Sequence, residues 1–345
     1  PLMYLRVLPV LLGCLWFMGC QPARDESYNE QLFAFGTLID ISFYGVPPDE
    51  ARQAVQAVDA LFQKQHNDWH AWQRGALDTL NQAIARGHSI ETDESIVQLI
   101  RLGQQFEISS NGLFNPAIGQ LLGLWGFQQD EPATTAPDPA AIIAWLNNKP
   151  SSLQIDIDKQ RIHSRNPRVK LDFGGFAKGH SVARAVALLE QRGIHNLIVN
   201  TGGDLCLRGR HGDRPWRIGI RSPGGTGVLA SIDLEGPQCV FTSGDYERYF
   251  EVDGQRYHHI LDPRSGYPAR STRSVTVLSD DAALADAAAT ALFIAGPQEW
   301  VTVAREMGVN EVLLIDSRGT AYITPALARQ IHFEEKPVRI EEIGL

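Results

Sequence analysis

Two polar side chains interrupt an alanine-rich segment late in the chain, and their spacing has a chemical meaning. In LADAAATALF, residues 284–293, Asp286 and Thr290 stand four residues apart. On a helix such residues project from one face, one turn apart. An aspartate near a helix start and a threonine bonded to its own helix are ordinary structural features. A carboxylate beside a neutral oxygen also suits Mg²⁺, which keeps several waters and takes its other ligands from phosphates. The spacing alone leaves both interpretations open.

Two glycine-rich segments could supply groups that bind phosphate. DFGGFAKG, residues 172–179, combines adjacent glycines with Lys178, so backbone groups and a positive charge can approach a ligand. In VNTGGDLCLRG, a second glycine pair immediately precedes Asp204. The first segment matches neither the dinucleotide-binding nor the P-loop pattern, and glycine turns are common. Each segment is therefore weak support by itself.

Adjacent histidines form a third candidate group. His258 and His259 precede ILDPRSGYP. A histidine can act as a general base near neutral pH, and His259 is the candidate. The alternative is a histidine that only makes hydrogen bonds within the fold, and the motif alone slightly favours that structural role.

Composition limits the class of protein. The chain has 345 residues, of which 43% are hydrophobic, so it can bury a substantial core as one large domain or two closely joined halves. Its formal net charge is −9, and Lys and Arg form no cluster. We therefore expect no nucleic-acid partner. Any bound phosphate would be held by backbone amides, a metal or a few local cations.

Hydrophobic periodicity predicts an α+β fold with a largely antiparallel sheet, which must position these residues. Residues 31–45 alternate like a single strand, and helical patterns cover 49–69 and 93–112. A strand and then a helix are expected over 274–300, so the helix carries Asp286 and Thr290.

Three further segments refine this prediction. Residues 169–207 resemble a βαβ unit, which would add a parallel element. The segments 215–223 and 228–236 are expected to continue the main sheet. The pair Asp253-Gly254 predicts a hairpin turn.

The N-terminus has the features of an export signal. After Arg6, an apolar run from Val7 to Gly19 has the length of a signal-peptide core and ends at Cys20. This end resembles the processing site of a bacterial lipoprotein. Cys14 fits the consensus letters somewhat better but leaves a very short apolar core. We therefore expect residues 1–20 to be a lipoprotein signal peptide, residues 21–345 to form the functional domain, and Cys20 to carry the lipid. A simple cleaved signal and an uncleaved anchor are the alternatives.

The two remaining cysteines, Cys206 and Cys239, have no metal-ligand spacing. An oxidising compartment would permit a disulfide between them. The prediction from sequence is two buried thiols, because each cysteine lies in a strand-like apolar run.

Four long segments, taken in order, resemble one known family. These are FNPAIGQLLGLWGF, LDFGGFAKGHSVARAVALLEQRGIHNLIVNTGGDL, TSGDYERYFEVDGQRYHHILDPRSGYP and ADAAATALF. Together they resemble the signature segments of the ApbE family, the flavin transferases, from about Phe33 to Pro297. Four long motifs in the same order argue against a chance similarity.

The resemblance implies a specific reaction. Members of this family cleave the pyrophosphate of FAD with Mg²⁺, attach FMN through a phosphodiester to a Ser or Thr hydroxyl of an exported protein, and release AMP. Targets include subunits of sodium-pumping NADH:quinone reductase and Rnf-type complexes. By motif match, the metal ligands would be the Ala177 backbone carbonyl, the Asp286 carboxylate and the Thr290 hydroxyl.

The resemblance assigns the remaining roles as well. His259 would be the base that deprotonates the acceptor hydroxyl, and Lys178 would offset charge on the phosphate and help to bind FAD. The FAD site would be lined by Gly36, Thr37, Asp204, Ser243, Gly244 and Asp245.

The sequence departs from the family pattern at two positions. Many members have a tyrosine over the flavin ring in the loop after the first long helix. Here HAW occupies that loop, so Trp72 is expected to cover the flavin, with Trp69 as the fallback. Asn115 stands where many members have aspartate, which removes a charge and keeps a turn-forming side chain.

Two alternative functions use the same residues. One is an FAD pyrophosphatase that releases free FMN and AMP, and the other is a periplasmic flavin-binding lipoprotein without turnover. The expected location in each case is the bacterial cell envelope, facing the periplasm and lipid-anchored to a membrane.

Overall fold

The structure, a computed structural model, describes residues 26–129, 131 and 133–345. The expected signal peptide and the expected lipidation site at Cys20 lie outside the described residues. Within that described part, each helix falls short of the length or the apolar character needed to traverse a bilayer.

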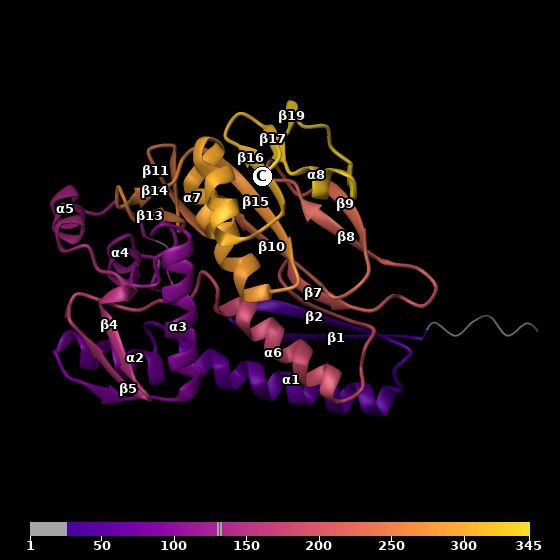
Figure 1. Cartoon of the computed structure of the whole chain (residues 1–345), viewed down its shortest axis with the longest axis horizontal. Helices are drawn as coiled ribbons and strands as arrows, with labels where there is room; N and C mark the ends of the chain where they lie inside the picture. Colours follow the sequence, from indigo (N-terminus) through magenta and orange to yellow (C-terminus); the bar gives the residue numbers. More distant parts are fainter. Residues whose placement is uncertain (1–25, 130, 132) are drawn as a thin grey trace, which may run out of the picture.

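A nine-stranded sheet runs through the molecule (Figure 1), in the order β1-β2-β6-β7-β10-β15-β16-β17-β19. Its neighbours pair antiparallel except for β17 and β19. This arrangement confirms the predicted α+β class with a largely antiparallel sheet. The strands are β1 Ser27–Ala34, β2 Thr37–Tyr44, β6 Leu197–Thr201, β7 Asp204–Arg208, β10 Gln238–Gly244, β15 Thr272–Ser279, β16 Glu311–Asp316, β17 Thr320–Ile323 and β19 Arg339–Glu342.

The first strands form a hairpin, so the prediction of one strand over 31–45 is wrong. Phe35 and Gly36 have φ values of 54° and 73°, and two successive left-handed residues suit a tight hairpin turn. The alternation continues on both sides of the turn, which is why the pattern resembled a single strand. The hairpin predicted at Asp253-Gly254 is confirmed: β11 (Tyr249–Val252) and β12 (Gln255–His258) are joined through these two residues.

A separate three-stranded sheet covers one face of the central sheet. It consists of β8 (Trp216–Arg221), β9 (Val228–Leu234) and β18 (Ile331–Phe333). Apolar residues of β8 and β9 pack with Leu207 and Val240 of the central sheet in one buried cluster. The prediction that residues 215–236 continue the main sheet is therefore wrong, because β8 buries alternate residues against that sheet instead of pairing with its edge.

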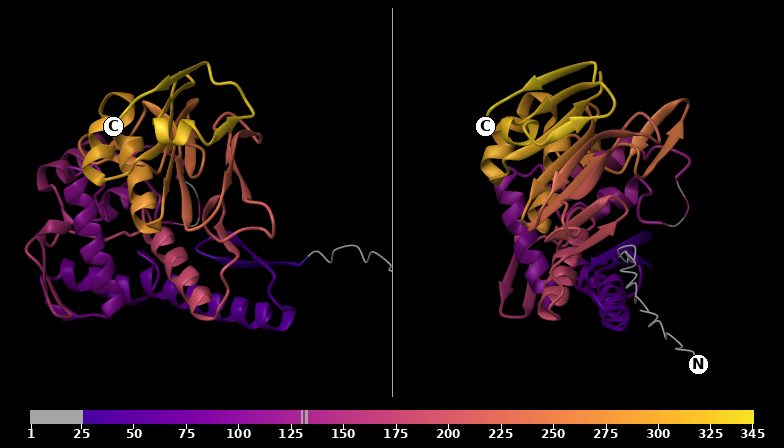
Figure 2. Two further views of the ribbon diagram at one scale, coloured as in Figure 1. Left: turned by 45° about the vertical axis from the view of Figure 1, so that its right-hand side comes forward. Right: turned by 90° about the vertical axis from the view of Figure 1, so that its right-hand side faces the viewer.

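The large helices lie on the other face of the central sheet, away from β8 and β9 (Figure 2). They are α1 Pro48–Trp69, α2 Ala76–Ala85, α3 Glu94–Ser109, α6 Ala177–Gln191 and α7 Ala282–Met307. Helix α7 begins at the N-cap Asp281, whose side chain accepts from the Leu284 amide. Its alanines are almost fully buried, because small side chains allow the helix to lie close to its neighbours.

A smaller subdomain has its own core, which contains Trp125, Trp145 and Phe250. The β11–β12 hairpin belongs to it. Its other elements are α4 Gly119–Leu124, α5 Pro139–Asn148, β13 Leu261–Asp262 and β14 Tyr267–Pro268. The remaining short elements of the chain are β3 Ile90–Glu91, the 3-10 helix η1 Ser152–Gln154, β4 Ile155–Asp158, β5 Arg161–Ser164 and α8 Pro325–Ala328.

The segment 169–207 is not a βαβ unit. Lys170 makes only an isolated bridge with Ile118, and residues 169–176, all of them described, form no strand before α6. After α6, β6 and β7 pair antiparallel as a hairpin through the glycine turn. The helix therefore leads into a hairpin and adds no parallel pair to the sheet.

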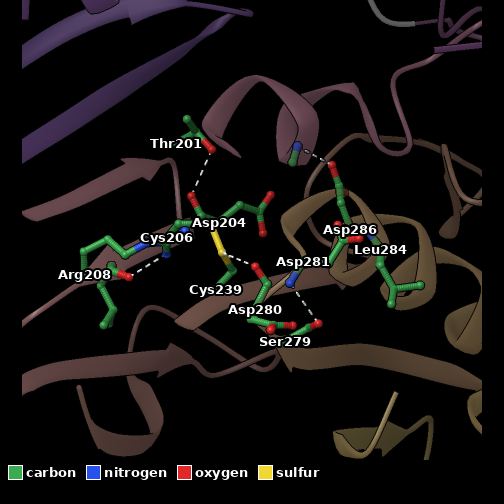
Figure 3. Close-up of a disulfide and its surroundings, with 12 residues drawn as sticks. Thr201, Asp204, Cys206, Arg208, Cys239, Ser279, Asp280, Asp281, Leu284 and Asp286 are labelled. Carbon is green, nitrogen blue, oxygen red and sulfur yellow. Dashed lines mark hydrogen bonds between the residues drawn. A yellow bond between two sulfur atoms is a disulfide. The ribbon is translucent and has the colours of Figure 1, made fainter. Parts of the chain in front are cut away.

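Cys206 and Cys239 form a disulfide (Figure 3), so the prediction of two separate thiols is wrong. Strands β7 and β10 pair antiparallel, and their register sets the two cysteines directly opposite each other. The cysteines are 33 residues apart, and only the register of two distant strands brings them together. Sequence spacing gave no sign of that register.

Candidate active site

Helices α6 and α7 contact each other through two segments that the sequence analysis singled out, DFGGFAKG and LADAAATALF. The Gly179 amide in α6 donates to Oδ2 of Asp286 in α7, at 2.9 Å. A Cβ on Gly179 would lie 2.3 Å from the Ala282 carbonyl oxygen and 2.9 Å from the Asp286 Cβ. Only glycine permits this approach, so the glycine of AKGHS fixes one oxygen of the buried carboxylate.

Asp286 and Thr290 lie on one helix, as their spacing predicts. Burial raises the pKa of Asp286 above its ordinary value, while the positive charge of Lys178 opposes that rise. The Thr290 hydroxyl lies 3.2 Å from the Ser243 hydroxyl and 3.4 Å from the Asp286 carbonyl oxygen, to which it donates. These contacts bring the end of β10 to the same face of α7.

The oxygen atoms in this region suit a hard cation. Ala177 opens α6, two residues before Gly179, and its backbone carbonyl belongs to the same helix start as the Asp286 contact. Over the described ranges, no cluster of three or more His, Cys, Asp or Glu could hold a metal. An ion here would have one carboxylate, neutral oxygens and substrate phosphates as ligands, and Mg²⁺ accepts that combination. The residues present therefore fit the implied metal.

Lys178 and Asp204 form an ion pair between α6 and β7. Asp204 is held from its other side, because the Thr242 amide of β10 donates to its Oδ1 at 2.8 Å. Burial alone would lower the pKa of Lys178, but the charges of Asp204 and Asp286 outweigh burial and raise it. The lysine is thus a fixed positive charge beside the proposed metal ligands.

The cysteine bridge lies next to this pair. Cys206 follows Asp204 by two residues on β7, and Figure 3 shows the disulfide beside Asp204 and close to the start of α7. On the α7 side, the Cys239 sulfur is 4.0 Å from the Asp280 carbonyl oxygen. The disulfide therefore ties β7, the strand that carries Asp204, to β10.

The TSGDY turn serves two purposes. Ser243 contacts Thr290, whereas Asp245 forms an ion pair with Arg273 at 2.8 Å. Burial raises the pKa of Asp245, and the charge of Arg273 opposes that rise. A Cβ on Gly244 would lie 2.6 Å from the Tyr246 ring, so a larger residue would displace that ring. Asp245 is thus engaged within the fold, while Ser243 faces the α7 pair.

Gly36 and Thr37 reach this region through a second glycine turn. A Cβ on Gly202 would lie 2.7 Å from the Thr37 hydroxyl oxygen. Gly202 has a φ of 72° and Gly203 a φ of 112°, conformations that favour glycine. The β1–β2 turn therefore packs on the turn that leads into Asp204.

The two histidines have different environments. His258 is buried, its Nε2 donates to the Ala269 carbonyl oxygen at 2.6 Å, and its Nδ1 accepts from the Ile260 amide. Burial lowers the pKa of His258 to about 4. His258 is therefore a neutral structural histidine, which is the role that the motif left open for this pair.

His259 is half-buried and held by Arg248. Its Nδ1 lies 3.2 Å from the Arg248 carbonyl oxygen, and its amide donates to the same oxygen at 3.1 Å. A carbonyl only accepts, so Nδ1 carries the hydrogen and Nε2 keeps a free lone pair. Burial, followed by the charges of Arg248, His258 and Lys178, lowers the pKa of His259 well below its ordinary value.

Trp72 lies in the loop after α1, as expected, and is half-buried. Its ring lies 4.4 Å from the His70 ring and 5.9 Å below the Arg248 guanidinium, centre to centre. The fallback residue Trp69 is buried in the core against His180. Of the two tryptophans, Trp72 is therefore the one free to face a ligand.

Asn115 keeps the turn-forming role expected of it. Its Oδ1 accepts from the Ala117 amide at 2.8 Å, and its Nδ2 donates to the Pro150 carbonyl oxygen at 2.9 Å. An aspartate could accept the first bond but could not donate the second.

Sequence reasoning missed Glu247 and Arg248. Glu247 lies close enough to Lys178 and Asp204 for their charges to act on its pKa, which burial raises. Arg248 contacts both His259 and Trp72. Both residues follow TSGDY directly in the sequence. This position was the only sequence feature that could have indicated that they lie near the site.

The fold agrees with comparisons to known proteins. A crystal structure of the ApbE protein from Thermotoga maritima is similar with a TM-score of 0.80 and 33% identity, covering 90% of this chain and 100% of that one. The ApbE family model matches residues 35–314. The chain belongs to the ApbE family.

Curated relatives carry an activity name. The FAD:protein FMN transferase of Rhodobacter capsulatus is 41% identical over 314 residues, which cover 91% of this chain and 60% of the relative. The FAD:protein FMN transferase of Treponema pallidum is 33% identical over 85% of each chain. The chain thus spans less than two thirds of the first relative and most of the second.

Proposed function

We propose that this protein is an Mg²⁺-dependent FAD:protein FMN transferase. It moves FMN from FAD to a Ser or Thr hydroxyl of an acceptor protein, forms a phosphodiester and releases AMP. The observation that carries the proposal is that the Lys178–Asp204 ion pair lies close to Asp286, which shares a helix face with Thr290, and that the charge of Lys178 also acts on His259. The activity names of the relatives support it.

The protein's own groups fit the steps of this reaction. His259 Nε2 accepts the proton of the acceptor hydroxyl as the new oxygen–phosphorus bond forms. The bond between the two phosphates breaks, and AMP leaves with the bridging oxygen. The Lys178 ammonium offsets negative charge that builds up on the phosphate oxygens. The Ala177 carbonyl, Asp286 and Thr290 would hold Mg²⁺, which would supply further charge neutralisation at the pyrophosphate.

Preorganisation is the contribution of the fold to this step. Asp204 is fixed by the Thr242 amide and in turn fixes Lys178 before any ligand arrives. One Asp286 oxygen is already bound to the Gly179 amide. These charged side chains then need little rearrangement during transfer. Preorganised charges of this kind raise the rate because no free energy is spent on orienting them in the transition state.

The remaining FAD contacts are assigned by position. Trp72 covers the flavin ring, and Gly36, Thr37 and Ser243 line the approach to the phosphates. Asp245 acts on the FAD site through the turn that it stabilises with Arg273.

The protein is proposed to act at the periplasmic face of the cell envelope, attached by a lipid on Cys20. The apolar N-terminal run supports export, and the Cys206–Cys239 disulfide is typical of an oxidising compartment. Acceptors are proposed among subunits of sodium-pumping NADH:quinone reductase or Rnf-type complexes. Replacing Cys20 with serine should move the protein from the membrane fraction to the soluble fraction, and unchanged fractionation would contradict the anchor.

One assay tests the proposed activity. Purified protein is incubated with FAD and Mg²⁺, with and without a candidate acceptor domain, and the nucleotides and the acceptor mass are followed together. A gain of one FMN per acceptor with equal AMP release supports transfer. Free FMN and AMP beside unmodified acceptors would favour FAD hydrolysis, and FAD bound without cleavage would contradict an enzyme.

A further inference from the structure

Arg248 has no assigned role, yet it contacts three segments around the site. Its Nη2 donates to the Phe127 carbonyl oxygen, and its guanidinium lies 5.9 Å from the centre of the Trp72 ring. Its backbone carbonyl accepts from the His259 amide. The loop after α1, the segment after α4 and the end of β12 are thus joined by one residue.

The side chain has a geometric reason to hold its own backbone in place. Arg248 is an exposed residue just before β11, and the His259 amide already holds its carbonyl beside the end of the β11–β12 ladder. The bond to Phe127 and the contact with Trp72 tie the guanidinium at two points. The Phe127 ring also packs edge-on against His259, with 6.3 Å between ring centres. The carbonyl that fixes Nδ1–H of His259 is therefore positioned both by the hairpin pairing and by the tied Arg248 side chain.

The charge of Arg248 also acts on His259, because it lowers the pKa of the imidazole. A guanidinium beside an imidazole disfavours a second positive charge on the ring. The charged or titratable groups that face His259 are Arg248, His258 and Lys178, and His258 is itself neutral and buried. Arg248 is the exposed member of this set, so it can be changed with the least effect on the core.

We propose that Arg248 is a positioning residue that links Trp72 to His259 and keeps the His259 imidazole neutral with its Nε2 lone pair free. The role of His259 as base rests on the proposed function. The state of the imidazole does not, so it can be measured without turnover.

The first measurement is ¹⁵N NMR of the histidine rings in the whole protein, with His259 assigned by comparison with His259→Gln. The unmodified protein should give the Nδ1–H tautomer with a low pKa. In Arg248→Met the signal should become a mixture of tautomers and its pKa should rise. In Arg248→Lys the pKa should stay low, because the charge is kept, while the tautomer becomes mixed because the planar contacts are lost.

Kinetics give the second measurement. Arg248→Met should lower kcat for transfer by about tenfold, a fraction of the 10²–10⁴ that general base catalysis supplies. The KM for FAD should rise only about two- to fivefold, as expected for losing one cation–π contact. Arg256→Met is the matched control, because Arg256 lies 4.1 Å over the Tyr249 ring on the same hairpin and does not contact His259. That control should leave kcat within twofold.

The outcomes separate this inference from the proposed function. An unchanged tautomer and pKa in Arg248→Met would overturn the inference, whatever the transfer rate. Equal kinetic losses in Arg248→Met and Arg256→Met would also overturn it, because the effect would then belong to the hairpin in general. Full transfer by His259→Gln would instead remove His259 from the proposed mechanism, while the NMR result would still decide the role of Arg248.

Discussion

The two sides of the proposed site differ in how they are built. Lys178, Asp204 and Asp286 project from α6, β7 and α7, elements anchored in the large core. His259 and Arg248 belong to the β11–β12 region, which packs on the much smaller core around Trp125 and Phe250. The first side fixes charge in a buried setting. The second holds a half-buried His259 and an exposed Arg248 beside a hairpin.

This difference matches the two substrates of the proposed reaction. A pyrophosphate presents the same charges in every FAD molecule, so a rigid set of partners is adequate. An acceptor protein must bring its hydroxyl in from solvent and leave again as product. A side with a small core can adjust at lower free-energy cost, because local opening is easiest where few apolar contacts are broken. The predictions below test this contrast from the largest effect to the smallest.

Asp286→Asn should have the largest effect on the rigid side. The amide keeps the shape and can still accept from Gly179, but it removes the only carboxylate proposed to hold Mg²⁺. Transfer should fall by at least ~10³-fold, since the rate depends on offsetting charge at the phosphate. The readout is acceptor mass with time.

Asp281→Asn provides the matched control on the same helix. Asp281 caps α7 through the Leu284 amide, and asparagine caps equally well. Activity within twofold is expected. A loss as large as that of Asp286→Asn would mean that helix integrity, and not the ligand, explains the first result.

Gly179→Ala should destabilise the fold itself. The added Cβ meets the Ala282 backbone at 2.3 Å, so α6 and α7 must move apart. We expect a loss of about 1–3 kcal/mol in the free energy of unfolding, as in other overpacked cores. Urea denaturation measures the loss. Gly123→Ala in α4 meets only the end of Gln128 at 3.5 Å and should change stability little; a similar loss there would refute the close-contact explanation.

His258 should make the hairpin side sensitive to acid. Its folded pKa of about 4 lies below the ordinary value of 6.5, so the unfolded chain binds the proton more readily between these values. The contribution of neutral His258 to the free energy of unfolding is fully present above pH 6.5. It falls by up to ~3 kcal/mol as the pH decreases toward 4. His258→Gln should flatten this dependence in urea melts at pH 7 and 4.5. His180 and His259, whose pKa values burial also lowers, would retain their own shares, and identical slopes for both proteins would contradict the assignment.

Trp72→Phe should give the smallest effect. Phenylalanine keeps an aromatic face but binds a cation more weakly, so the contact with Arg248 loses a fraction of its ~0.5–1 kcal/mol. FAD affinity should fall about two- to threefold in a fluorescence titration. As a control, Tyr249→Leu removes the ring that Arg256 contacts on the β11–β12 hairpin, and it should leave FAD affinity unchanged. A change larger than tenfold in Trp72→Phe would indicate that the indole does more than cover the ring.

The sequence predicted the helix face that carries Asp286 and Thr290, because i and i+4 spacing depends only on local geometry. It also predicted the β11–β12 turn and the α+β class. It did not predict the cysteine bridge, the position of β8 and β9, or the contact at Gly179. These depend on strand register and helix packing between distant segments. Arg248 was missed for the same reason, since only the folded chain brings it to Trp72 and His259.

The β1–β2 hairpin sets a length scale for the proposed lipid anchor. β1 runs from Ser27 to Ala34 and spans about 26 Å at ~3.3 Å per residue, and Thr37 after its turn packs against Gly202 in the turn leading to Asp204. If Cys20 carries the lipid, the six residues before Ser27 add at most ~20 Å. The strand and the residues before it then set the largest distance between the membrane and the proposed site. Acceptor hydroxyls displayed within a few nanometres of the bilayer would be within reach, and those held farther out would be spared.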